Sequence, residues 1–281
     1  ILILFLIYST ESGKLWMAEI WDIVTAFLYG DLDEEIYMEA PDGFERFFAF
    51  NRKLECLILD KAIYGLVQAA RQFYKKLKNA LVQKLEFEKC KADPCLFYKK
   101  SELGTCIICC YVDDLAFFGN RSAVKDVVQK LQEQFDMKHV GNLKEYVGCT
   151  INFENGKGGK VAYLTQPDII KKMVKKFGKE FSKMGSFKTP SSPGYIAGRI
   201  NDEVKLTGEL QKKFRSGVGT LLYLVKHSRP DIANSVREHA KVMDGANNRH
   251  YKELLRTMKF VAVSYTHLRA HETRHDLVCR L

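Results

Sequence analysis

Three carboxylates of this chain lie inside runs of apolar residues. Asp113 and Asp114 are adjacent at the centre of CIICCYVDDLAFFGN, residues 106–120, and Asp22 interrupts MAEIWDIVTAFL, residues 17–28. An ionised carboxylate in an apolar setting is costly unless it is paired or bound to a cation. The three acids therefore predict a site that a cation completes.

Magnesium is the cation that such acids suit. It prefers octahedral oxygen coordination and commonly shares a few protein carboxylates with substrate phosphates and water. Two such ions close together can activate the attacking oxygen and stabilise the leaving oxygen in phosphoryl transfer. A single acid such as Asp22 would more often be a turn residue or an ion-pair partner. Together with the adjacent pair, it favours a metal-dependent phosphoryl-transfer site.

The apolar runs around the acids predict the strands that would carry them. Residues 106–119 are predicted to form two short strands joined by a tight turn at 112–114, because β-forming residues flank the acids on both sides. Residues 17–28 are predicted to form a buried strand interrupted by Asp22. Rigid strands would thus hold all three carboxylates.

Helical periodicity follows each acidic region. A helix is predicted from Ala69, and a second from about Ala123, where Asn120 or Ser122 could cap the first turn. The apolar positions of the first helix are Phe73, Leu77 and Leu81, and those of the second are Val124, Val127, Val128, Leu131 and Phe135.

The second half of the chain predicts a hairpin and then helices. Two strand-like runs flank NGKGG, residues 155–159, which is a hairpin signal. KKMVKKFGKEF is predicted to be a short basic amphipathic helix, TPSSPGYIAGRIND a linker, and Pro230 part of the first turn of another helix. A last helix is predicted after Asn247 or Asn248, with an apolar face formed by Tyr251, Leu254, Leu255 and Met258.

Composition bounds the class of protein. The chain has 281 residues, of which 46% are hydrophobic, enough for a folded core and more than one subdomain. Lys and Arg (44) outnumber Asp and Glu (34), which suits a partner with a phosphate backbone but is equally compatible with any basic protein. The opening ILILFLIY is too short to span a bilayer and lacks the pattern of a signal peptide, so we expect a core segment of a fragment.

The eight cysteines lie mostly inside apolar runs without regular spacing, which favours a reducing compartment over a secreted disulfide scaffold. A four-cysteine zinc site can be drawn from Cys90, Cys95, Cys106 and Cys109. Residues three apart on a strand point to opposite faces, so Cys106 and Cys109 could not ligate one ion without a break in the strand. A cysteine–zinc interaction module is therefore the weaker alternative.

The motifs and their order resemble the reverse transcriptase of copia-type LTR retrotransposons. That family's active-site hairpin reads Tyr-Val-Asp-Asp, matched by residues 111–114, and its first catalytic strand resembles WDIVTAFLYGDLDEEIYMEAPDGF, with Asp22 at the first catalytic position. ILDKAIYGLVQAARQFYKKL resembles the family's Leu-Tyr-Gly-Leu-Lys-Gln-Ala-Pro-Arg-Gln-Trp-Tyr motif, with Val67 and Ala70 in place of its Lys and Pro. YVGCTI and VGTLLYLVKHSRPDIANSV match later signature segments.

The resemblance implies an α+β right-hand polymerase fold. It comprises a palm, in which helices cover one face of an antiparallel sheet, partial fingers and a mostly helical thumb. Residues 1–145 would form the palm with partial fingers, 146–190 the primer-positioning hairpin and the start of the thumb, and 191–261 the thumb and connection helices.

Residues 262–281 do not continue the family pattern. We expect an artefact of sequencing, cloning or assembly appended to a genuine fragment. The alternative is a metal site, because His267, His271 and His275 are four residues apart and would share one face of a helix.

The resemblance also implies the roles of individual residues. Asp22, Asp113 and Asp114 would be catalytic and, with Ile23, would hold two Mg²⁺ ions, for which Mn²⁺ could substitute. Phe27 stands where the family places an aromatic residue that excludes the ribose 2′-hydroxyl, although it also suits a core position. Ile23 and Val24 would offer backbone amides near the triphosphate, and the other expected nucleotide contacts are Tyr64 and Gly65. The expected template or primer contacts are Gln68, Arg71, Tyr111, Val147, Gly148, Lys171, Lys172, Lys175 and Lys176.

The expected activity is RNA-directed DNA synthesis on a primer 3′ end. The expected partners are an RNA template, a DNA primer and deoxynucleoside triphosphates, without a membrane, and the integrase and RNase H parts of the polyprotein are expected to be absent from this chain. The expected location is the cytoplasm, within a virus-like particle, or the nucleus, but not outside the cell. The alternative is an inactive remnant of the same fold that only binds nucleic acid, and for the four lysines a solvated helix face.

Overall fold

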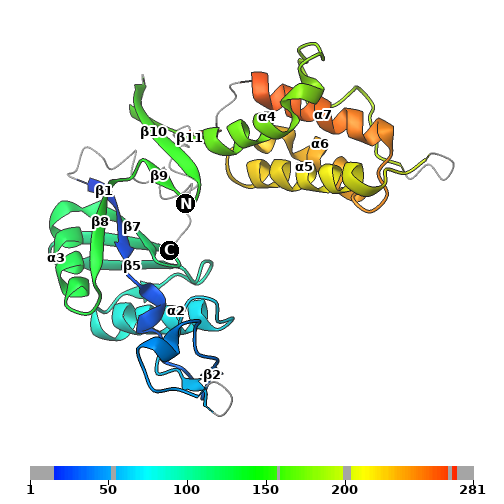
Figure 1. The fold of residues 1–281 in the computed structure, drawn as a ribbon. Coiled ribbons are helices and arrows are strands. Elements are labelled where there is room, and N and C mark those ends of the chain that lie inside the picture. The colour runs from blue at the N-terminus through cyan, green and yellow to red at the C-terminus, as the bar shows by residue number, and fades with distance from the viewer. Residues whose placement is uncertain (1–15, 52–54, 157–158, 199–203, 265–267, 271–281) are drawn as a thin grey trace. The chain divides into compact units, whose positions relative to one another are not determined.

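The chain folds into two units in a computed structural model (Figure 1). The first unit comprises Ile1–Leu143 with Arg274–Leu281, and the second comprises Lys144–Thr273. Each unit has a hydrophobic core of its own. The residues that the structure describes are 16–51, 55–156, 159–198, 204–264 and 268–270.

A six-stranded sheet forms the frame of the first unit. Its strands, in spatial order, are Glu88–Lys89 (β4), Leu96–Ser101 (β5), Gly104–Tyr111 (β6), Asp114–Asn120 (β7), Trp16–Ile23 (β1) and Met137–Asn142 (β8). Every neighbouring pair is antiparallel. The α+β class and the antiparallel sheet predicted from the sequence are confirmed, as is the tight turn between β6 and β7.

Two helices pack on one face of this sheet. Helix α2 (Ala69–Asn79), continued by the π-helical turn η4 (Ala80–Lys84), and helix α3 (Arg121–Gln132) bury the apolar positions predicted for them. They share one core with alternate strand residues, among them Ile108, Leu115 and Phe117, which are completely buried. Burying each such side chain stabilises the fold by about 1.5–3 kcal/mol. This packing fixes which face of each strand points away from the helices.

The strand predicted over residues 17–28 is shorter than expected. β1 ends at Ile23, and Thr25 has a φ of 52°, in the left-handed region that β-branched residues rarely adopt. The 3₁₀ turn η2 (Ala26–Tyr29) then leads the chain out of the sheet. An apolar pattern could not reveal this end, because the residues after Ile23 are as apolar as those before it.

The capping prediction for α3 is wrong in its chemistry. Asn120 precedes the helix, but its side-chain oxygen accepts a hydrogen bond from the N–H of Thr105 (2.8 Å). The hydroxyl of Ser122 donates to the carbonyl of Leu103 (2.8 Å). Both polar side chains therefore tie the start of α3 to the turn between β5 and β6.

A smaller sheet follows η2 in the first unit. Strands β2 (Tyr37–Met38) and β3 (Leu57–Ile58) pair antiparallel, and the 3₁₀ turn η3 (Phe44–Arg46) lies between them in the chain.

The second unit begins with a sheet of four strands. In spatial order they are Leu268–Ala270 (β12), Gly159–Thr165 (β11), Cys149–Gly156 (β10) and Glu145–Tyr146 (β9). The pairing of β10 with β11 confirms the predicted hairpin, whose tip at residues 157–158 lies outside the described residues. Strand β12, which belongs to the tail that does not follow the family pattern, pairs with β11. The prediction of a histidine metal site falls outside the described residues, as does that of a core segment at residues 1–8. The three histidines of that site are His267, His271 and His275.

Helices make up the rest of the second unit and share one core. They are Pro167–Phe181 (α4), Gly208–His227 (α5), the 3₁₀ turn Pro230–Ile232 (η5), Ala233–Lys241 (α6) and Asn248–Val263 (α7). The predicted helices correspond to α4, to η5 with α6, and to α7, which Asn247 caps by accepting from the N–H of His250 (3.0 Å). Residue patterns had not predicted α5. No helix in the described part of the chain is both long and apolar enough to cross a membrane.

The segment predicted as a linker is held against the helices over residues 189–198. Glu253 of α7 accepts from the N–H (3.1 Å) and the hydroxyl (2.6 Å) of Ser192. Glu238 of α6, only 8% exposed, accepts from the N–H of Ala197 (3.1 Å). The linker interpretation is therefore wrong for this part, because its Ser- and Pro-rich composition conceals specific partners in helices that follow it in the chain.

Candidate active site

Asp22 and Asp114 lie directly opposite each other across the β1–β7 pair. Residues opposite each other on antiparallel strands point to the same face, with Cβ atoms about 4.5–5.5 Å apart. Their neighbours Ile23 and Leu115 belong to the core under the helices, so both acids point to the other face. Like charges directly opposite each other destabilise a sheet. This pair is therefore an unfavourable arrangement for the fold alone.

Asp113 joins the pair from the turn between β6 and β7. Tyr111 pairs with Asp114, which leaves Val112 and Asp113 as the two turn residues. Val112 has a φ of 57°, in the region where a hairpin turn usually has glycine. The N–H of Ile23 donates to the Asp113 carbonyl (3.0 Å), which ties the turn to the end of β1. The structure thus brings the three predicted catalytic acids together from two elements.

The electrostatics of the site reflect this crowding. Burial raises the pKa of Asp114, and the charges of Asp113 and Asp22 raise it further. The pKa of Asp22 is also raised, by burial and then by Asp113, while Lys138 acts in the opposite direction. Lys138 lies opposite Asp22 on β8. Sequence reasoning missed this lysine, because only the β1–β8 register brings it to the acids.

The three carboxylates have the chemistry of a site for a bound cation. In the ranges that the structure describes, no side chain donates a hydrogen bond to them or forms an ion pair with them. The described residues also contain no group of three or more His, Cys, Asp or Glu side chains that is already arranged to hold a metal ion. Burial and neighbouring negative charges raise the pKa of Asp22 and of Asp114, and an added divalent ion would stabilise the charged forms of both.

The structure corrects the expected role of two backbone amides. The N–H of Ile23 is engaged by the Asp113 carbonyl, and the N–H of Val24 donates to the Asp136 carbonyl (2.9 Å). Neither is free to bind a triphosphate, contrary to the prediction for residues 23 and 24. For the exposed Thr25 and for Phe27, no acceptor of the N–H lies among the described residues. The left-handed φ of Thr25 takes the chain out of the sheet at this residue, and the sequence alone does not show it.

Phe27 and Tyr64, both predicted nucleotide contacts, lie side by side. Their ring centroids are 4.5 Å apart and the rings are tilted by 50°. Phe27 is half-buried against the core under α2 and α3, whereas Tyr64 is 58% exposed. Gly65 follows with a φ of 105°, which glycine adopts without strain. Phe27 therefore combines a core contact with a partly exposed ring beside another aromatic residue.

Gln68 and Arg71, predicted template contacts, border an acidic segment. The amide of Gln68 approaches Glu34 (3.5 Å), while its helix neighbour Lys75 donates to Asp33 (2.7 Å). Arg71 is exposed, and its charge contributes to the lowered pKa of Asp33, for which hydrogen bonds from Lys75 and Gln72 are the main causes. Much of the positive charge on this face of α2 is thus already balanced within the chain.

The family is decided by the match of residues 2–191 to the model described as reverse transcriptase (RNA-dependent DNA polymerase). The chain belongs to the reverse transcriptase family. Its expected origin in a retrotransposon Pol polyprotein is confirmed by its relatives.

The relatives of this reverse transcriptase domain are much longer proteins. It is 31% identical over 250 residues to the retrovirus-related Pol polyprotein from transposon TNT 1-94 of Nicotiana tabacum, covering 85% of this chain and 18% of the relative. It is 27% identical over 263 residues to that from transposon RE1 of Arabidopsis thaliana, covering 93% of this chain and 17% of the relative. The chain thus spans less than one fifth of these relatives. No solved structure matches it.

The predicted primer contacts of this reverse transcriptase domain lie in its second unit. Val147 and Gly148 form the turn between β9 and β10, with φ angles of 50° and 70°. Lys172 and Lys175 of α4 have no partner among the described residues, whereas Lys171 approaches Asp168 (3.4 Å) and Lys176 donates to the hydroxyl of Ser216 (2.6 Å). Tyr111, assigned to the same role, is in the first unit and is 53% exposed.

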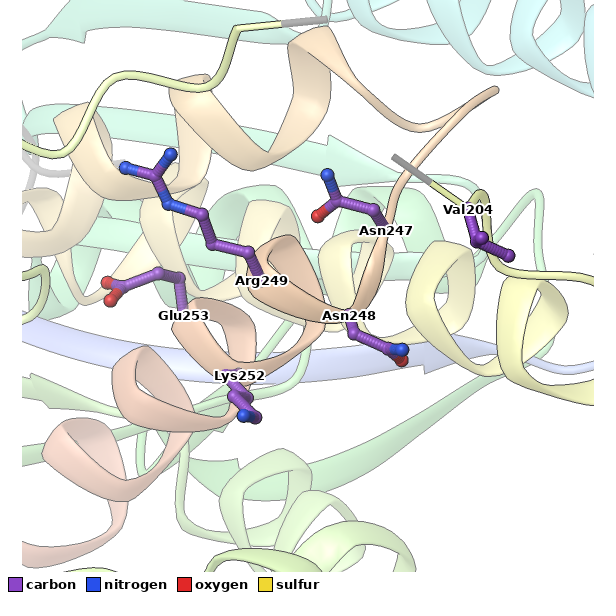
Figure 2. Close-up of a pocket in the computed structure, with 6 residues that line it drawn as sticks. All are labelled: Val204, Asn247, Asn248, Arg249, Lys252 and Glu253. Atoms are coloured by element: carbon purple, nitrogen blue, oxygen red, sulfur yellow. The ribbon is translucent and has the colours of Figure 1, made fainter. Parts of the chain in front are cut away.

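A shallow pocket of about 440 Å³ also lies in the second unit, at the start of α7 (Figure 2). None of the predicted site residues lines it, and one of its walls, Glu253, is already bound to Ser192. We therefore assign it no part in the site. Its lining residues are Val204, Asn247, Asn248, Arg249, Lys252 and Glu253.

Proposed function

We propose that this domain catalyses RNA-directed DNA synthesis by two-metal nucleotidyl transfer. The observation that carries the proposal is the opposition of Asp22 and Asp114 across β1 and β7, with Asp113 beside them. The sheet holds these like charges together at a cost to stability, which a catalytic role explains. Two Mg²⁺ ions bound there, or Mn²⁺ in their place, would activate the primer hydroxyl and neutralise the triphosphate.

The chain's own residues would position the reactants. Asp22, Asp113 and Asp114 would supply carboxylate oxygens, and Ile23 could contribute only its carbonyl, since its N–H is engaged. The N–H of the exposed Thr25 is the better candidate donor to the triphosphate. Phe27, supported by the Tyr64 ring, would contact the sugar and exclude a 2′-hydroxyl.

The functional divisions of the fold remain part of this proposal. The six-stranded sheet with α2 and α3 would be the palm, β2 and β3 would belong to partial fingers, and α4 to α7 would form the thumb and connection. RNA template, DNA primer and deoxynucleoside triphosphates would be the partners. Lys172 and Lys175 are the lysines best placed to contact a duplex backbone, because their charges have no internal partner among the described residues.

Primer extension tests the proposal. The chain is incubated with poly(rA)–oligo(dT), Mg²⁺ and dTTP, alongside Asp113→Asn and a matched control, Asp126→Asn, whose carboxylate pairs with Lys130 on the exposed side of α3. Extension by the wild type and the control, but not by Asp113→Asn, is expected. Equal extension by all three proteins would refute the assignment of the acids.

An inactive remnant that only binds nucleic acid is the competing function, and the basic composition favours it as much as it favours a polymerase. It predicts duplex binding that is the same in Mg²⁺ and in EDTA, with no extension by any variant. That result would leave the family unchanged and remove the proposed activity.

A further inference from the structure

The turn between β9 and β10 has a demanding backbone conformation. Val147 and Gly148 are both in the left-handed region, the pattern of a type I′ hairpin turn. Glycine adopts this conformation readily, but for a β-branched residue it is strained by about 1–2 kcal/mol. Such strain persists only where the surroundings over-determine it. The ladder that supports it is short: β9 and β10 share the pairs Tyr146–Cys149 and Glu145–Thr150, and the N–H of Ile151 donates to the carbonyl of Lys144 (2.7 Å).

A side chain from helix α5 adds to the support of this short ladder. The hydroxyl of Tyr223 donates to the carbonyl of Val147 (3.2 Å), although the two residues are 76 positions apart in the chain. The same hydroxyl faces Gly148, since a Cβ atom added at that glycine would lie only 2.6 Å from the hydroxyl oxygen. Tyr223 therefore contacts both residues of the turn.

The Tyr223 side chain is itself held in place. Its ring lies against His227, one turn further along α5, with centroids 4.6 Å apart. A ring nitrogen of His227, Nδ1, lies 3.0 Å from the Tyr223 carbonyl. The phenol thus reaches the turn from a helix whose Leu221 and Leu224 are completely buried in the core of the second unit.

We propose that Tyr223 is a positioning residue that holds the Val147–Gly148 turn in the shape needed to place the primer terminus. The inference rests on the proposed function of this turn and extends it to a residue that contacts no reacting atom. It also links two segments, YVGCTI and VGTLLYLVKHSRPDIANSV, that the sequence presents as separate motifs. The atom that matters is the phenol oxygen, since the ring could remain on its helix without it.

The test compares Tyr223→Phe with Tyr37→Phe, which also loses one hydroxyl, from an exposed tyrosine of the first unit. Amide hydrogen exchange at residues 147–149 is expected to accelerate about threefold to tenfold in Tyr223→Phe, the range that one net hydrogen bond supports. The rate of single-nucleotide incorporation is expected to fall by about the same factor, with duplex affinity within about twofold of the wild type. Tyr37→Phe should change none of the three.

A second pair of variants isolates the oxygen. Gly148→Ala brings a methyl group against the Tyr223 hydroxyl, but the next atom of that ring would lie 3.7 Å from the new Cβ, an ordinary contact. The loss of incorporation caused by Gly148→Ala should therefore be smaller in the Tyr223→Phe background than in the wild type. The strain of a positive φ at residue 148 remains in both backgrounds and cancels in the comparison.

The outcomes separate this inference from the proposed function. If exchange at the turn is unchanged in Tyr223→Phe, or if the two substitutions are strictly additive, Tyr223 does not hold the turn. A parallel loss of incorporation, duplex binding and melting temperature would show a general structural role and would also overturn the inference. If the wild type extends no primer, the proposed function fails, and exchange at the turn still decides whether Tyr223 holds it.

Discussion

Each unit of this reverse transcriptase domain contains a hairpin turn with a valine in the left-handed region. Val112 (φ 57°) precedes Asp113 between β6 and β7, and Val147 (φ 50°) precedes Gly148 between β9 and β10. The first turn joins two central strands of a six-stranded sheet, and the second joins strands that share two residue pairs. The same local strain is thus supported in two ways.

The difference shows where each turn can tolerate change. The sheet fixes the first turn from both sides, so the turn can carry Asp113 next to Asp114 of β7, although their charges repel. The second turn carries no charge and is held by a short ladder together with one distant hydroxyl, that of Tyr223. We expect substitutions of the acids and of Phe27 in the first unit to change chemistry and nucleotide choice, and those in the second unit to change duplex binding or the placement of the primer terminus.

Replacing Asp22 with Asn should have the largest effect. Primer extension should fall at least about 100-fold, because even residues that only support metal ligands cost 10–100-fold when they are removed. Duplex binding should remain, since the acids do not contribute to it. Loss of binding in parallel with extension would contradict the separation of roles between the units.

The same variant should melt at a higher temperature than the wild type in the absence of divalent ions. The folded chain raises the pKa of Asp22, chiefly through burial and through Asp113, so it holds that proton more tightly than the unfolded chain does. The contribution of Asp22 to stability is therefore fully present below pH 3.8 and is lost as the pH rises through the folded-state value. Thermal melts of both proteins between pH 3 and pH 7 should show that the melting temperature of Asp22→Asn rises relative to that of the wild type as the pH increases.

Phe27→Ala should have the next largest effect, on nucleotide choice. Opening this position should raise the ratio of ribonucleotide to deoxynucleotide incorporation by about 10–100-fold, the range expected when one steric contact is removed. Tyr64→Ala should act in the same direction but less strongly, through loss of the ring beside Phe27. An unchanged ratio in Phe27→Ala, with normal deoxynucleotide incorporation, would leave Phe27 as a core residue only.

Lysine substitutions in α4 should have moderate effects, on binding alone. Lys172→Gln and Lys175→Gln should each weaken duplex binding irrespective of sequence and reduce the salt dependence of log Kd by about 1. Lys176→Gln should have a smaller effect, because Lys176 already donates to Ser216. Binding titrations from 50 to 200 mM salt measure the slopes, and identical slopes for all variants would indicate a solvated face.

Glycine at the two valines should have the smallest effect on global stability. Val112→Gly and Val147→Gly each relieve a positive φ but increase the entropy of the unfolded chain, so the free energy of unfolding should change by less than about 1 kcal/mol. Local amide exchange should distinguish them. It should accelerate more at residue 148 in Val147→Gly than at residue 113 in Val112→Gly, and the reverse order would break the comparison.

The sequence predicted the strands and the hairpin that carry the three acids, because these elements depend on neighbouring residues in the chain. Asp113 and Asp114 could be placed on a hairpin because apolar residues flank them, and Asp22 on a strand for the same reason. Lys138 could not be placed beside Asp22, because a register between strands 116 positions apart in the chain is set by the packed sheet. The engagement of the Ile23 and Val24 amides depends equally on residues 113 and 136.

The hydrogen-bonded segment 189–198 has a practical consequence for anyone who expresses this domain. The family match ends at residue 191, inside that segment, so a chain cut there would lose Ser192 and Ala197 together with the helices that bind them. Expressing those helices alone from residue 199 would remove the donors that Ser192 supplies to Glu253 and that Ala197 supplies to Glu238, at about 0.5–1.5 kcal/mol for each hydrogen bond lost. A useful boundary for expression therefore lies before the second unit begins at Lys144 or after α7, and not at the edge of the family match.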